Sequence, residues 1–122
     1  MTAQILVMGK ERDYYEIRLD RELLEKEIRE TTKGISAGRL LDKLRTKNRI
    51  SSNQLRNYGC TLSSKEDNAK NKNLIDCVEA FFQRAVQYAD EHGAPYVLVQ
   101  ELKINQSPLY FDMSGLVQLL IE

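Results

Sequence analysis

The sequence has no tryptophan, one histidine, two cysteines and two prolines in 122 residues. Two cysteines are too few for a disulfide scaffold, and one histidine cannot supply the two or three imidazole ligands of a usual zinc site. The longest apolar runs, such as residues 5–8, span about four residues, whereas a membrane-spanning helix needs about 20. We therefore expect no metal site, no disulfide framework and no membrane partner.

The first 20 residues also lack a secretory signal. They carry Glu11, Asp13, Glu16 and Asp20, with no basic start followed by an apolar stretch. This pattern predicts a cytoplasmic protein. Cys60 and Cys77 lie 17 residues apart without CxxC spacing, and in that compartment we expect both to be reduced thiols.

The composition that is present predicts one folded domain spanning residues 1–122. Hydrophobic residues make up 42% of the chain and charged residues 30%, which suits a packed interior with a polar surface. The length also matches a single domain, since two smaller pieces would bury too little core.

The amino-terminal half predicts a hairpin followed by helices. β-prone residues indicate a strand at 3–8, and alternating residues indicate a second strand at 14–19. Apolar stripes at helical spacing, preceded by Asp20 and Ser36 as caps, indicate helices at 21–31 and 37–47. Ser51 or Ser52 then caps a predicted short helix that runs through Tyr58. Residues 61–72 show no regular pattern and are predicted to form a mobile loop.

The carboxyl-terminal half predicts a long helix and a second hairpin. Apolar residues cover about half the circumference of a helix over 73–92, and Gly93 and Pro95 follow as a stop. Residues 96–104 and 109–113 read as strands around a turn. The last segment, 116–121, fits a helix capped by Ser114 and fits a strand almost as well.

This order predicts an α+β fold. The two terminal β-hairpins form an antiparallel sheet, the long central amphipathic helix packs on it, and a smaller basic helical segment lies between them. A homodimer is a further hypothesis, because Tyr14, Tyr110 and Phe111 add aromatic surface and an exposed edge strand such as 96–104 can pair with a copy of itself. Core packing of these aromatic residues is the alternative.

Catalytic and cofactor motifs are missing. The sequence contains neither GxGxxG nor GxxxxGK[ST], so the common backbone cradles for nucleotide phosphates are not present. We therefore predict no cofactor, no catalytic residues and no enzyme activity, with a small enzyme of a class without local motifs as an open alternative. His92 stands at a helix end, where its ring is expected to contact the last carbonyls.

The formal net charge is zero, but the charges are unevenly placed. Residues 1–32 carry six basic and eight acidic side chains, residues 33–72 ten and three, and residues 73–122 two and seven. Asp42 is the only acid between Lys33 and Arg56. The chain therefore has a basic middle between acidic ends.

This basic segment, 33–56, is the predicted contact surface. Arg39, Lys43 and Lys47 recur every four residues and would form one row on a helix, with polar and basic residues following. Such a row suits phosphates, and neutral amides suit backbone or base-edge contacts. The predicted contact residues are Arg39, Lys43, Arg45, Lys47, Arg49, Asn53, Gln54 and Arg56. The alternative is that these cations pair with Glu22, Glu25, Glu27 and Glu30 of the preceding helix.

The sequence thus predicts a small non-catalytic binding protein that contacts nucleic acid or a nucleoprotein complex through this basic segment. The alternative is an inhibitor, immunity or regulatory factor of phage or mobile-element type that acts on a protein target through charged faces.

Overall fold

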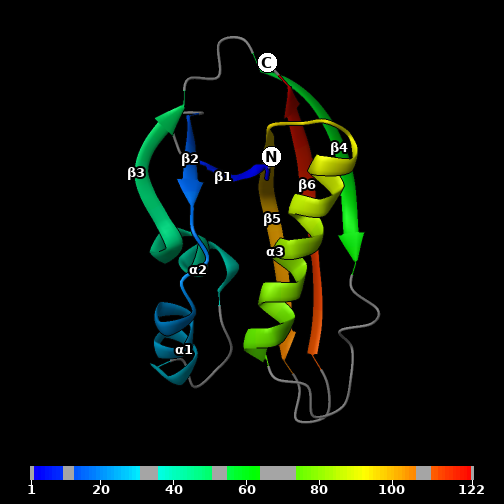
Figure 1. The fold of residues 1–122 in the computed structure, drawn as a ribbon. Helices are drawn as coiled ribbons and strands as arrows, with labels where there is room; N and C mark the ends of the chain where they lie inside the picture. Colours follow the sequence, from blue (N-terminus) through cyan, green and yellow to red (C-terminus); the bar gives the residue numbers. More distant parts are fainter. Residues whose placement is uncertain are drawn as a thin grey trace.

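A computed structural model describes residues 2–9, 13–30, 36–50, 55–63, 74–106 and 111–121. The fold is α+β, as predicted, with a long helix packed on a sheet (Figure 1). Its elements in chain order are β1 (Gln4–Met8), β2 (Tyr14–Ile17), α1 (Arg21–Glu30), α2 (Ala37–Leu44), β3 (Arg45–Ile50), β4 (Arg56–Ser63), α3 (Leu74–Glu91), β5 (Tyr96–Gln106) and β6 (Phe111–Ile121).

The strands form one six-stranded sheet in the order β3-β2-β1-β5-β6-β4. Both predicted hairpins are present, because β1 pairs with β2 and β5 pairs with β6, each antiparallel. The sheet is nevertheless mixed rather than purely antiparallel, since β1 and β5 run parallel where the two hairpins meet. The predicted strand 96–104 is therefore not an edge, because β5 has β1 on one side and β6 on the other.

Three other predictions are wrong. The helix expected over 37–47 ends at Leu44, where its apolar stripe ends, and the chain passes directly into β3. The short helix expected through Tyr58 is not formed at its carboxyl end, because residues from Arg56 onward belong to β4. Residues 61–63, expected in a loop, also belong to β4, while 64–72 lie outside the described residues.

The last segment is a strand, the second of the two forms that its pattern allowed. β6 lies between β5 and β4; Val117 and Leu119 are buried on its helix side and Leu120 on the opposite face, each at most 2% exposed, and the one residue between them is partly buried. A strand covered on both faces carries an almost continuous apolar run, which resembles a buried helix in sequence.

The main core lies between the helices and one face of the sheet. α3 contacts β5 and β6, along which it runs in Figure 1. Its fully buried Phe81 and Val78 pack with Val97 and Val99 of β5 and with Leu24 of α1 in one cluster. Gly93, at φ 67°, ends α3 in the left-handed conformation that favours glycine, as the Gly93 and Pro95 pattern predicted.

A smaller cluster lies on the opposite face of the sheet. Leu6, Leu98 and Leu120 are at most 1% exposed and alternate along their strands with residues of the main core. Tyr14, Leu55 and Tyr96 pack around them. Because these aromatic rings cover the three leucines, Tyr14 contributes to packing, which was the alternative to an interface role.

Candidate nucleic-acid interface

The structure divides the predicted contact residues between a helix and two strands. Arg39 and Lys43 lie on α2, and Arg45, Lys47 and Arg49 occupy alternate positions of β3. The side chains of Lys47 and Arg49 lie outside the description, as do Asn53 and Gln54 altogether. Arg56 begins β4, at the opposite edge of the sheet from β3. The expected helical row of basic residues therefore ends at Lys43. The basic residues that follow it belong to an edge strand, β3.

Arg39 is tied to the fold. Its guanidinium forms an ion pair with Glu27 of α1, whose side chain is only 4% exposed. Ser36 holds the start of α2 by accepting a hydrogen bond from the Arg39 backbone N–H. A carboxylate taken out of water needs a charged partner, so the Arg39 side chain links α1 and α2. This contact is one that the alternative interpretation of the charges predicted.

Lys43 and Arg45 are placed differently, because both are exposed at the junction of α2 and β3. Neither forms an ion pair within the described residues. Arg45 carries the first backbone N–H beyond α2, which donates to the carbonyl of Asp42. Its guanidinium lies 4.8 Å from the centre of the Tyr15 ring, a cation–π contact that fixes the charge and leaves it open to solvent.

β3 is a sheet edge in the described part of the chain. It pairs antiparallel with β2, with Tyr15 opposite Arg49 and Ile17 opposite Arg45, and the register shifts between these pairs. Thr46 Oγ1 also donates a 2.8 Å hydrogen bond to the carbonyl of Glu16. Among the described residues, the outer side of β3 therefore has no pairing strand beside its alternating basic positions, and we call Lys43, Arg45, Lys47 and Arg49 the basic edge.

The sequence did not identify Tyr15 as part of this region. Its alternation with Ile17 indicated a residue on the buried face of a strand, and the ring is indeed partly buried against the main core. The contact with Arg45 arises because β3 folds back beside β2, which no local pattern showed.

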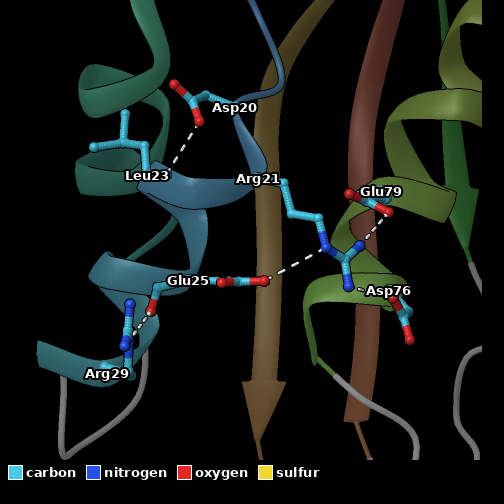
Figure 2. Close-up of polar contacts among 7 residues, drawn as sticks. All are labelled: Asp20, Arg21, Leu23, Glu25, Arg29, Asp76 and Glu79. Atoms are coloured by element: carbon cyan, nitrogen blue, oxygen red, sulfur yellow. Dashed lines mark hydrogen bonds and ion pairs between the residues drawn. The ribbon is translucent and has the colours of Figure 1, made fainter.

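The acids of α1 and α3 gather around another cation (Figure 2). Arg21 Nη1 lies 2.8 Å from Glu79 and Nη2 lies 3.3 Å from Asp76, both on α3, while Nε lies 3.5 Å from Glu25. The hydrogen bond with Glu79, and then that with Asp76, raises the pKa of Arg21. This cluster joins α1 to α3.

The cysteines and the histidine of the described residues lie on β4, on α3 and just after α3. Cys60 and Cys77 are not joined by a disulfide. The hydrogen bond between the Tyr88 hydroxyl and Cys60, together with burial, raises the pKa of Tyr88. The centre of the His92 ring lies 4.3 Å from that of Tyr88, with the two planes tilted by 50°, and its Nδ1 lies 2.8 Å from the Tyr88 carbonyl, the helix-end contact that the sequence predicted.

Three further findings concern metal ligands, an apolar groove and membranes. Across the ranges that the structure describes, no three or more His, Cys, Asp or Glu side chains come together as metal ligands. An open apolar groove of about 400 Å³ lies between α3 and β1, lined by residues such as Ile5, Leu19 and Val86. None of the described helices combines the length and apolar character needed to cross a membrane.

Comparison of the chain with protein-family models, with curated proteins and with solved structures found no match.

Proposed function

We propose that this chain is a cytoplasmic, non-catalytic binding protein that contacts nucleic acid, alone or within a nucleoprotein complex, through the basic edge. The observation that carries the proposal is that Lys43 at the end of α2 and Arg45 at the start of β3 are both exposed, without an acidic partner in the described part of the chain. Exposed, unpaired cations are the groups that neutralise phosphates.

The clustering of cations along the basic edge supports nucleic acid as the ligand. Arg45, Lys47 and Arg49 occupy every second position in the sequence of β3. The register shift places the four-residue step from Arg45 to Arg49 opposite a step of only two residues in β2, which gathers these positions within a short length of the edge. The Tyr15 ring beneath Arg45 adds an aromatic surface of the kind that nucleic-acid-binding grooves combine with cations.

The predicted contact residues should therefore contribute unequally. Lys43 and Arg45 are free to meet phosphates, whereas Arg39 is engaged by Glu27 and its removal should weaken the fold more than the binding. Arg56 lies at the other edge of the sheet and should contribute little.

Binding of a labelled 20-nucleotide single strand, measured by fluorescence anisotropy between 50 and 200 mM salt, tests the proposal. We expect the affinity to fall steeply with salt. The slope of the logarithm of the binding constant against the logarithm of the salt concentration should become shallower by about 0.7 for each phosphate that the protein no longer neutralises. The double variant Lys43→Ala/Arg45→Ala should flatten the slope by about 1.4 on the same basis, and Arg56→Ala, the matched control, should leave it unchanged. An affinity that is insensitive to salt, or equal effects in the two variants, would contradict the proposal.

The protein-target alternative has a separate outcome. If a pull-down after nuclease treatment recovers one stoichiometric protein partner, and the chain shows no salt-dependent binding to single strands or duplexes, the inhibitor or regulatory function replaces nucleic-acid binding.

A further inference from the structure

The two edges of the sheet have different chemistry. In the described part of the chain, β3 ends the sheet on one side and β4 on the other. Edge strands resist pairing with another chain through charges, prolines and bulges. β3 has basic residues at alternate positions and a shifted register, whereas β4 has one charged residue, Arg56, at its first position.

β4 is also long and regular. It pairs with β6 over eight successive residues, from Arg56 opposite Ile121 to Ser63 opposite Ser114, without a register shift. Tyr58 is 62% exposed, the more exposed of two large hydrophobic side chains on the surface of the described residues, the other being Met8 at 43%. A long edge without a register shift, with an exposed aromatic ring and almost no charge, is a surface on which another strand can be added.

We propose that a second copy of this chain pairs antiparallel with the outer side of β4, so that the two sheets become one continuous sheet. The axis that relates the copies stands perpendicular to the sheet, which keeps the helices of both on one side. Tyr58, Cys60 and Leu62 of β4 face that side, because they lie opposite Leu119, Val117 and Gly115 of β6.

Two registers pair the most residues while matching these faces. With Gly59 on the axis, residues 56–62 pair, and with Cys60 on the axis, residues 57–63 pair. In neither register does Arg56 meet Arg56. The same operation on β3, with the axis at Lys47, would set the basic positions 45 and 49 opposite each other and 47 opposite itself, and like charges directly opposite are destabilising. The charges therefore select β4 and disfavour β3 as the dimer edge.

The mass of the chain in solution gives the first test. A strand-edge interface is small, so we expect a concentration-dependent rise from 14.1 kDa toward twice that mass in sedimentation equilibrium. Thr61→Lys, which adds a charge at an exposed position of β4, should weaken dimerisation at least about tenfold. Gln83→Lys is the matched control, since Gln83 is exposed on the side of α3 that faces Leu19 and Ile5. A mass that stays at 14.1 kDa at every concentration overturns the proposal without any variant.

Cross-linking tests the location of the interface. In both registers the Cα atoms of the two Cys60 residues lie within about 8 Å, from one strand spacing and two residues of rise. Cys60 is partly exposed and Cys77 is fully buried. A short bismaleimide should therefore give a covalent dimer that forms in Cys77→Ala and does not form in Cys60→Ser. A dimer by mass that does not cross-link through Cys60, or that Thr61→Lys leaves intact while circular dichroism shows a native fold, places the interface elsewhere and overturns the proposal.

Discussion

At the scale of single residues, Arg39 and Lys43 show how neighbouring cations take different roles. They lie one helical turn apart on α2, and both side chains are solvent-accessible. Arg39 reaches the buried carboxylate of Glu27, which fixes α2 against α1, while Lys43 has no ion-pair partner in the described residues. From sequence spacing alone, Arg39 and Lys43 are equivalent members of one row. They differ in the structure because α1 places Glu27 within reach of Arg39.

Arg39→Ala should therefore destabilise the protein and Lys43→Ala should not. Removing Arg39 leaves the Glu27 carboxylate buried without that cation, which should lower the free energy of unfolding by about 1–3 kcal/mol. Lys43→Ala, the control, should stay within about 0.5 kcal/mol of the wild type. Urea denaturation of both variants measures the difference. Equal effects would show that the Arg39–Glu27 pair does not stabilise the fold.

Tyr88 and Cys60 make a second residue-scale prediction. The hydrogen bond to Cys60 favours the protonated phenol, so Cys60→Ala should lower the pKa of Tyr88 toward its ordinary value of 10.0. The contribution of this bond to stability is present at lower pH and is lost as the pH rises through the raised pKa of Tyr88. Phenolate absorbance measures the titration, with Tyr88→Phe to identify the signal and Cys77→Ala as the control. An unchanged titration in Cys60→Ala would contradict the contact.

At the scale of elements, the predictable parts were those whose own pattern decides their structure. The hairpin strands, α1 and α3 follow their apolar periods and caps, and α3 ends at Gly93 as expected. β3 and β4 could not be predicted from an apolar period or a cap of their own. Residues 45–49 have no apolar side chain, and they form a strand because β2 offers a pairing edge. Residues 57–62 do alternate, with Tyr58, Cys60 and Leu62 on one face, but helical caps upstream suggested the wrong period.

The same elements explain the candidate site. The concentration of basic residues in 33–56 was visible in the sequence, because it depends on composition alone. Which cations share an edge depended on where α2 ends, so the row through Arg39, Lys43 and Lys47 became an edge centred on β3. The Arg39–Glu27 and Arg45–Tyr15 contacts join residues that local patterns do not bring together.

Gly115 makes the element-scale prediction, because β6 and α3 approach each other closely there. A Cβ at this position would lie 2.5 Å from the Glu101 carbonyl oxygen and 2.6 Å from the Phe81 ring. Gly115→Ala should therefore push α3 from the sheet and cost about 1–3 kcal/mol. At Gly59, a matched strand glycine, the nearest atom is 3.7 Å away, so Gly59→Ala should be neutral or slightly stabilising. Thermal unfolding at low concentration compares the two, and equal melting temperatures would refute the close packing of Phe81 on β6.

At the scale of the whole molecule, the chain consists of two consecutive halves. Residues 2–50 hold β1, β2, β3, α1 and α2, and residues 55–121 hold β4, α3, β5 and β6. Every antiparallel pair of strands lies within one half, and the parallel pairing of β1 with β5 joins them over three residue pairs. Arg21 and the hydrogen bond from the Ala3 N–H to Asp90 also cross between the halves.

We call the pairing of β1 with β5 the seam. The seam is short, but the composition of the core indicates that the two halves do not unfold separately. The main cluster contains Leu24 and Leu40 of the first half together with Phe81 and Val97 of the second. On the opposite face, Leu6 and Leu98 are paired across the seam and are both fully buried. Separation of the halves would expose both clusters to water, so neither half retains a complete core.

We therefore predict one cooperative transition in urea, with circular dichroism and tyrosine fluorescence giving the same midpoint. Leu6→Ala removes packing at the seam and should lower the free energy of unfolding by about 2–5 kcal/mol, while the transition stays single. Gln4→Ala, an exposed change on the same strand and the same face, should have little effect. Two separated transitions, or a Leu6→Ala variant in which the two probes diverge, would show that the halves are independent domains, because a shared core requires both to lose their structure together.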